Sequence, residues 1–138
     1  MKYHMLTISS NPNNILELES HLQKWASSYK IQPDKYADIL ISLTEAVNNA
    51  IIHGNKYDES KNVHIDYIEG AEGLTFCVTD EGVGFNPRGV PDPTSVEKLD
   101  CCGGRGVYIM KALADNICFK NKGRSVEMYF SIHKQHAL

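Results

Sequence analysis

Apolar and polar residues follow two different periods along this chain, and each period predicts one kind of element. Alternation with a period of two predicts five strands, at residues 2–9, 63–67, 74–78, 117–119 and 126–132. Helical spacing of the apolar residues predicts three helices, at residues 15–29, 33–54 and from 103 onward. Asn13 or Asn14 is expected to cap the first helix, and Pro33 to open the second.

The order of these elements indicates the class of fold. Strands and helices are too interleaved for a helical bundle, and hairpin signals at 69–73 and 121–124 exclude an all-parallel sheet. We therefore expect an α+β fold. It would be a two-layer α/β sandwich, with a mixed, mostly antiparallel sheet and three helices on one face. No repeat or linker interrupts the chain, so residues 1–138 are expected to form a single domain.

Composition narrows the class of protein. Of the 138 residues, 42% are hydrophobic and 22% charged, which is typical of a soluble globular domain. A net charge of −3 argues against a general nucleic-acid surface. No apolar run approaches the roughly 18 residues of a membrane span, and the N-terminus lacks a signal sequence. A cytoplasmic location without membrane attachment is therefore the default expectation.

The four cysteines give little chemistry. Cys77 and Cys118 lie in apolar runs and are expected to be small core residues. Cys101 and Cys102 are adjacent and have no C-x-x-C spacing, which favours free thiols over a disulfide. A soft-metal or redox site at this pair is the disfavoured alternative, because no second thiol pair or histidine lies near it in the sequence.

The end of the second predicted helix carries a polar stripe. Glu45, Asn49 and His53 recur at every fourth position and share one helical face, opposite an apolar stripe. A carboxylate and a carboxamide on one face suit a hydrated divalent cation with a water or hydroxyl beside it. The alternative is an ordinary solvated face that ends at Gly54.

Two glycine-rich stretches follow. Asp80, Gly82 and Gly84 come directly after a strand, where a carboxylate can accept a hydrogen bond from an exocyclic amine such as that of adenine. Residues 103–106 read Gly-Gly-Arg-Gly at a helix start, where free amides suit phosphate and Arg105 adds a positive charge. The alternatives are a capped glycine turn and a flexible loop end. Neither a Walker-A pattern nor a G-x-G-x-x-G motif after the first strand is present.

Together these motifs are far more specific than any one of them. E-A-V-N-N-A-I-I-H-G at 45–54, D-E-G-V-G-F-N-P at 80–87, V-P-D-P-T at 90–94 and the glycine-rich helix start at 103–115 resemble the GHKL ATPase superfamily. Within it, the chain resembles the stand-alone bacterial anti-sigma-factor serine/threonine kinases. The resemblance spans nearly the whole chain and implies the GHKL ATPase fold, with ATP or ADP and Mg²⁺ as cofactors.

The resemblance also implies roles for residues at matching positions. Asn49 would coordinate Mg²⁺, and Glu45 would be the general base toward a serine hydroxyl. Asp80 would bind the adenine amine in a pocket shaped by Gly82 and Gly84.

Three further positions would contact the phosphates. Gly104 and Gly106 would place their amides there, and Arg105 would face the γ-phosphate. Ser125 stands where the family often has threonine and would contribute its hydroxyl to the nucleotide site. The role of His53 stays open between lining the site and ending the helix.

The implied function is that of an anti-sigma factor that phosphorylates a serine of an anti-anti-sigma antagonist. Its partners would be that antagonist and a sigma factor, and the family's kinases commonly form homodimers. The alternative is a nucleotide-gated binding module that sequesters a regulator without transferring phosphate. Intact Glu45 and Asn49 favour the kinase.

Overall fold

The computed structural model describes residues 2–83 and 104–132, and these form five strands and three α-helices. The strands are β1 (Lys2–Ser9), β2 (Asn62–Glu69), β3 (Gly73–Thr79), β4 (Asn116–Lys120) and β5 (Ser125–Ser131). The helices are α1 (Ile15–Tyr29), α2 (Pro33–Asn49) and α3 (Gly104–Leu113), with a short 3₁₀-helix η1 (Pro12–Asn14) and a π-helix η2 (Ala50–Gly54). None of the helices in these ranges is both long and apolar enough to cross a membrane.

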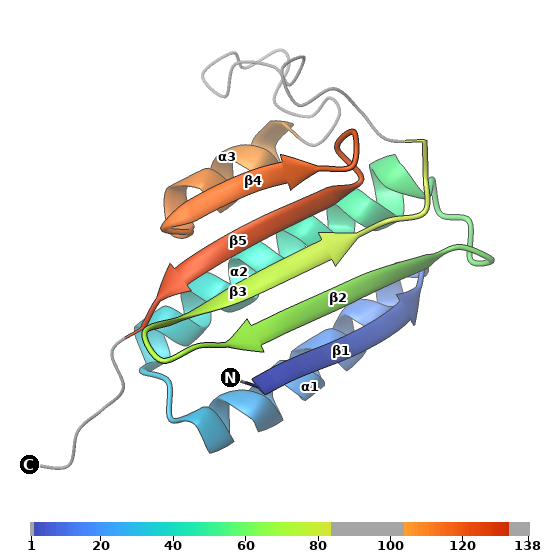
Figure 1. The fold of residues 1–138 in the computed structure, drawn as a ribbon. Helices are drawn as coiled ribbons and strands as arrows, with labels where there is room; N and C mark the ends of the chain where they lie inside the picture. The colour runs from blue at the N-terminus through green and yellow to red at the C-terminus, as the bar shows by residue number, and fades with distance from the viewer. Residues whose placement is uncertain (1, 84–103, 133–138) are drawn as a thin grey trace, which may run out of the picture.

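The sheet has the order β1-β2-β3-β5-β4, and the connections explain its pairing (Figure 1). All four pairings among these strands are antiparallel, so the sheet is not mixed within the described residues. The helical connection after β3 could have placed β4 beside it in parallel. Instead β5 folds back between them through the β4–β5 hairpin, which keeps each neighbour antiparallel.

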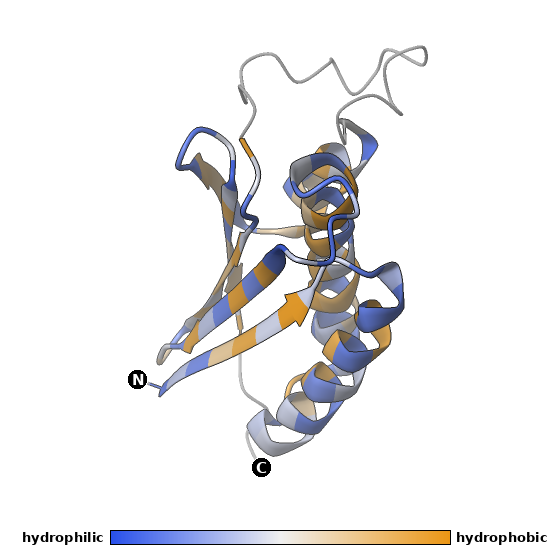
Figure 2. Cartoon of the chain, turned by 90° about the vertical axis from the view of Figure 1, so that its right-hand side faces the viewer, coloured by the Kyte–Doolittle hydropathy of each residue, from blue (hydrophilic) through white to orange (hydrophobic). Residues whose placement is uncertain are grey.

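The helices lie on one face of the sheet, which makes the two-layer sandwich expected from the sequence (Figures 1 and 2). Strand residues that alternate toward the helices form the centre of the core. Tyr67, Phe76 and Met128 illustrate this as one cross-strand row, all at most 1% exposed. Trp25 on α1 packs against the same row and is 6% exposed, as its spacing predicted. Each such side chain contributes about 1.5–3 kcal/mol by leaving water.

The opposite face of the sheet carries the two described cysteines, which corrects one prediction. Cys77 is only half-buried and Cys118 is exposed, so neither is a core residue. Phe76 and Val78 point toward the helices, and period-two alternation sends Cys77 to the other face. In β4, Phe119 packs against the core, and the same alternation places its neighbour Cys118 on the outer face. Cys101 and Cys102 lie outside the described residues.

The helix starts confirm the positions of Pro33 and Asn14. Pro33 occupies the first turn of α2, as expected. It is Asn11, however, that caps with its side chain, accepting a hydrogen bond from the amide of Asn13 at 2.9 Å. Asn14 occupies the N-cap position of α1, as expected, but makes no side-chain cap hydrogen bond; its Nδ2 donates to the Ser9 carbonyl and hydroxyl.

Candidate functional site

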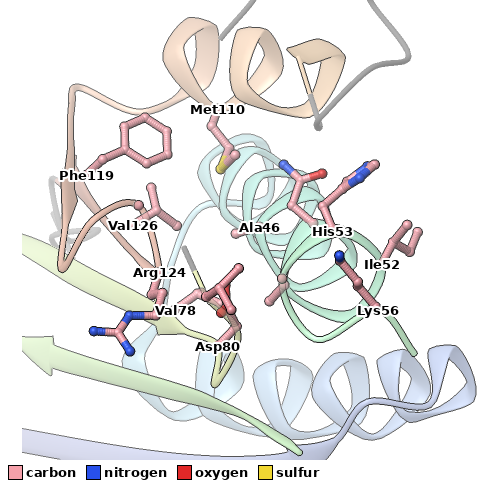
Figure 3. A pocket seen from close by; sticks show the side chains of 15 residues that line it. Ala46, Ile52, His53, Lys56, Val78, Asp80, Met110, Phe119, Arg124 and Val126 are labelled. Atoms are coloured by element: carbon pink, nitrogen blue, oxygen red, sulfur yellow. The ribbon is translucent and has the colours of Figure 1, made fainter. Parts of the chain in front are cut away.

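A pocket of about 500 Å³ opens where the end of α2 meets α3 and the ends of β3, β4 and β5 (Figure 3). This volume lies within the range of sites for small organic ligands. Its described lining combines an apolar wall with polar and basic groups at the edges: Ala46, Asn49, Ala50, Ile52, His53, Gly54, Lys56, Val78, Asp80, Val83, Met110, Phe119, Gly123, Arg124 and Val126.

The polar stripe predicted on the second helix reaches this pocket through a change of helix type. α2 ends at Asn49, and the next residues form the π-helix η2, closed by a bond of 2.7 Å from the Asn55 amide to the Ala50 carbonyl. Asn49 and His53 both line the pocket. A π-turn widens the helix locally and is frequent at functional sites.

Glu45 and Asn49 converge on the start of α3. A Cβ atom added at Gly106 would lie 2.9 Å from Asn49 Nδ2 and 3.0 Å from Glu45 Oε2. Both side chains therefore touch the surface of this buried glycine, and any larger residue would displace them. The sequence prediction that Glu45 and Asn49 share one face is confirmed, and Gly106 is the residue that lets α3 approach that face.

Asp80 supplies the carboxylate at the floor of the pocket, immediately after β3 (Figure 3). Its side chain is largely buried, and its Oδ1 accepts a hydrogen bond of 2.8 Å from the Gly82 amide. Burial raises the pKa of Asp80, while the bond from Gly82 and the nearby positive charge of Arg124 oppose that shift. Such a carboxylate is a poorly solvated acceptor, which strengthens any hydrogen bond it receives from a ligand.

Gly54 and Gly82 allow two backbone segments to meet around Asp80. A Cβ atom at Gly54 would overlap the Asp80 carboxylate, at 2.3 Å from Oδ2, and one at Gly82 would overlap the Gly54 carbonyl oxygen at 2.1 Å. Only hydrogen fits at either place. Gly54 is thus more than the helix stop predicted from sequence, because it forms part of the wall beside Asp80.

The remaining predicted residues have different positions. Gly104 begins α3, and Arg105 follows it in the first turn with an exposed side chain. Ser125 is buried and does not belong to the described lining of the pocket. Its hydroxyl forms a hydrogen bond of 2.9 Å with Thr79 Oγ1 and accepts another from the side-chain amide of Asn121. Gly84 lies outside the described residues.

Several lining residues were not predicted. The apolar wall is built by Val78, Met110, Phe119 and Val126, which lie in the predicted strands and helix but had no predicted role in a site. Lys56 and Arg124 add two basic groups at the edge. Lys56 has a left-handed backbone with φ 52°, uncommon for a non-glycine residue. Its neighbour Tyr57 has φ 62°, so the backbone after η2 is left-handed at two successive residues, and this turn is visible only in the structure.

The residues present fit a magnesium ion that takes few of its ligands from the protein and most of them from phosphate and water. Within residues 2–83 and 104–132, no three His, Cys, Asp or Glu side chains form a cluster that could hold a metal alone. Asn49 offers an amide oxygen at the pocket edge, next to the Glu45 carboxylate. Magnesium commonly uses one or two protein oxygens and completes its shell with phosphate and water, which suits this donor set.

Comparison with known proteins assigns the class. The profile of the histidine kinase-like ATPase domain family matches residues 8–130, so the chain belongs to that family. Within the family it belongs with the bacterial anti-sigma-factor kinases, since an anti-sigma F factor and a serine-protein kinase match most of its length. This confirms the family expected from the motifs, and an ATPase domain implies the use of a nucleotide.

Two relatives illustrate the similarity. The anti-sigma F factor of Clostridium perfringens (strain SM101) is 35% identical over 101 residues, covering 69% of this chain and 71% of that protein. The serine-protein kinase RsbW of Bacillus subtilis is 26% identical over 125 residues, covering 86% of this chain and 78% of that one.

A solved structure shares the fold. The crystal structure of the RsbU and RsbW domains of a Mycobacterium tuberculosis protein superposes with a TM-score of 0.69 at 14% identity. The match covers 96% of this chain but 32% of that longer chain. The predicted α+β class of fold is therefore confirmed.

Proposed function

We propose that this chain is an ATP-dependent serine/threonine protein kinase that acts as an anti-sigma factor and phosphorylates a serine of an anti-anti-sigma antagonist. The observation that carries the proposal is the convergence of Glu45 and Asn49 on Gly106, beside a pocket whose floor is the buried carboxylate of Asp80. This arrangement gives one place for a nucleobase and another for a reacting phosphate. The relatives named as anti-sigma F factor and as serine-protein kinase support the same function.

Adenine binding is assigned to Asp80 and the apolar wall. The Asp80 carboxylate would accept a hydrogen bond from the exocyclic amine, and the base would lie against Met110, Phe119 and Val126. Guanine has a carbonyl oxygen at the corresponding position and would face the carboxylate with another acceptor. Gly82 keeps the approach to Asp80 open, and we retain Gly84 as a prediction for the same wall.

Phosphate binding is assigned to the start of α3. Free amides at Gly104 and Gly106 and the helix dipole favour negative charge there, and Arg105 adds a cation for the γ-phosphate. Asn49 would hold Mg²⁺, which supplies positive charge that neutralises the phosphate oxygens when it is bound. The hydroxyl of Ser125 would act indirectly, through Thr79 and the end of β3, because it already bonds there.

Phosphoryl transfer then requires a positioned acceptor and a base. The serine hydroxyl oxygen of the antagonist would form a bond to the γ-phosphorus while the bond from that phosphorus to the β–γ bridging oxygen breaks and ADP leaves. The hydroxyl proton would pass to the carboxylate of Glu45. Lys56, at the pocket edge, would add positive charge near the nucleotide, and His53 lines the same pocket.

The wider setting follows from the same assignment. The sigma factor and the antagonist are the proposed protein partners, without direct nucleic-acid or membrane binding, and the proposed site of action is the cytoplasm. We also propose that residues 1–138 work as a single domain that forms homodimers. The second candidate function is a nucleotide-gated module that sequesters a sigma factor or another regulator without phosphoryl transfer. It is favoured by the described lining of the pocket, which does not include Glu45.

Glu45→Gln separates the two functions. The substitution keeps the shape of the side chain against Gly106 and removes the basic carboxylate. We expect Mg-ATP binding within about twofold of the original, and transfer to the antagonist reduced by at least about 100-fold. Calorimetry measures the binding, and radiolabelled γ-phosphate measures the transfer.

Asp38→Asn, a carboxylate change elsewhere on α2, is the control and should leave both quantities unchanged. Undiminished transfer by Glu45→Gln would exclude Glu45 as the base. Tight ATP binding by the unaltered chain without transfer to any antagonist would favour the binding module.

A further inference from the structure

Asn55 is a buried carboxamide directly beside the nucleotide pocket that no motif of the sequence singled out. It follows η2 and is 1% exposed. Its Nδ2 donates to Ser10 Oγ at 2.8 Å and to the Asn62 carbonyl at 3.0 Å. Its Oδ1 accepts the backbone amide of Glu81 at 2.8 Å. Asn55 therefore bonds at once to the ends of β1 and β2 and to the turn after β3.

The Glu81 amide belongs to the turn that places Asp80. Three successive amides in this turn each have a fixed acceptor: the Asp80 amide bonds to the Arg124 carbonyl at 2.9 Å, the Glu81 amide to Asn55 Oδ1, and the Gly82 amide to Asp80 Oδ1. The acceptor of the Glu81 amide is thus a side chain, that of Asn55, whose neighbours Gly54 and Lys56 both line the pocket. Gly54, the neighbour of Asn55, contacts both Asp80 and Gly82.

The chemistry of this position calls for an amide. The Ser10 hydroxyl and the Asn62 carbonyl lie on its Nδ2 side and the Glu81 backbone amide on its Oδ1 side, so one side chain must both donate and accept. The Glu81 amide is part-buried, and without the Asn55 acceptor it would lose its hydrogen bond and turn toward another partner, such as water. Because Asp80 is the adjacent residue, such a turn would move its carboxylate.

We propose that Asn55 is a positioning residue that sets the nucleobase selectivity of this site by holding the Asp80 carboxylate in place. The inference rests on the proposed function, in which Asp80 binds the adenine amine. Asn55 itself does not touch the nucleotide. It acts through the Glu81 amide, and the loss of that bond alone should reduce discrimination between adenine and guanine.

Asn55→Ala tests the proposal, with Mg-ADP and Mg-GDP as probes and calorimetry as the measurement. We expect the ratio of GDP to ADP dissociation constants to fall by about tenfold or more, because the lost bond no longer fixes the charged acceptor. A purely structural role would lower stability, or weaken both nucleotides alike, and leave this ratio unchanged.

Ser10→Ala is the matched control. Ser10 is 0% exposed and its hydroxyl bonds to Asn55 Nδ2 and to the Lys61 carbonyl, so this change disturbs the same buried network without touching the Glu81 bond. We expect a comparable loss of thermal stability, and a GDP-to-ADP ratio within about twofold of the original.

Asn55→Asp keeps an acceptor for Glu81 while removing the Nδ2 donor, and it should retain the preference for ADP. If Asn55→Ala does not fold, the Asn55→Asp variant provides the test. A folded Asn55→Asp variant that loses the preference for ADP over GDP overturns the proposal. So does a folded Asn55→Ala that keeps the original ratio, or a Ser10→Ala that loses it equally. If the unaltered chain itself binds ADP no better than GDP, adenine binding by Asp80 fails instead.

Discussion

Asp80 is a carboxylate that the fold keeps away from water at the floor of the pocket. Burial raises its pKa, and one backbone amide, that of Gly82, supports the charged form. A raised pKa means that ionised Asp80 destabilises the folded chain relative to the unfolded one, at every pH above its folded pKa. A carboxylate whose burial outweighs both the Gly82 hydrogen bond and the positive charge of Arg124 is typical of a ligand-binding position.

Asp80→Asn should therefore separate stability from binding. The free energy of unfolding of the ligand-free chain at pH 7 should rise, because the neutral amide replaces a poorly solvated charge and keeps an oxygen for Gly82. This gain should shrink as the pH falls and vanish below the usual carboxyl pKa of 3.8, where aspartate is protonated in both states. ADP affinity should fall by more than about tenfold.

Denaturant unfolding from pH 3 to 8 and calorimetry with ADP measure the two effects. Asp38→Asn is the control, since this residue lies on α2 away from the pocket lining. An Asp80→Asn variant that binds ADP normally would remove Asp80 from the nucleotide site. One that is less stable at pH 7 would show that the Asp80 carboxylate has a structural role.

At the scale of elements, the contact of α3 with α2 decides whether the polar stripe becomes a site. Helical spacing places Glu45 and Asn49 on one face, but Gly106 is what allows another helix to reach that face. The π-helix η2 then carries the chain past His53 to the wall beside Asp80. The site is thus built from the junctions between elements.

Gly106→Ala tests this contact. Alanine favours helix over glycine by about 1 kcal/mol, so the propensity of α3 should improve. The added methyl group would nevertheless lie within 3.0 Å of both the Glu45 and the Asn49 side chains and push them aside. We expect the melting temperature to change by only a few degrees, while Mg-ATP affinity falls by about tenfold or more.

Differential scanning fluorimetry and calorimetry measure these effects. Ala112→Gly, at an exposed position of the same helix, is the control: it should lower the melting temperature and leave nucleotide affinity unchanged. Equal loss of affinity in both variants would show that only the stability of α3 matters.

At the scale of the whole molecule, a second cluster of polar and aromatic groups joins β1, α1 and β2 away from the pocket lining. Tyr67 stacks on the His4 ring with centroids 4.5 Å apart, and its hydroxyl lies 2.8 Å from His21 Nε2. Trp25 donates to Glu69, which also contacts His4. This cluster fastens the β1 side of the sheet to α1.

Tyr67→Phe should change alkaline stability without changing the nucleotide site. Burial raises the pKa of Tyr67 to about 12. Between pH 10 and about 12 the unfolded chain loses this proton first, so the folded chain loses stability as the pH rises through that interval. Phenylalanine removes this loss, on the order of 2 kcal/mol, at the expense of about 1 kcal/mol at neutral pH from the missing hydrogen bond.

Denaturant unfolding from pH 8 to 12 measures the difference, with Tyr108→Phe as the control, because that side chain is 51% exposed. ADP affinity should be the same in both variants, since neither residue lines the pocket among the described residues. Parallel stability curves for Tyr67→Phe and the original chain would contradict the assignment.

The positions of the elements, the class of fold and the helical face that Glu45 and Asn49 share could all be predicted from the amino-acid sequence. These depend on local periodicity, which a single chain displays: Leu74, Phe76 and Val78 alternate, and Trp25 keeps helical spacing. The same alternation contained the outward positions of Cys77 and Cys118, which residue type alone had suggested were buried.

The way in which these elements meet could not be predicted from the sequence and is known from the folded chain. The place of β5 between β3 and β4, the π-turn after Asn49, the contact of Gly54 with Asp80 and the bond from Asn55 to Glu81 all join segments distant in sequence or depart from ideal helix geometry. Local periodicity carries no signal for such contacts, because each depends on the packing of two surfaces. The stripe that ends at His53 is a helix face by its sequence, and its residues Asn49 and His53 line a pocket because α3 and the turn after β3 close around them.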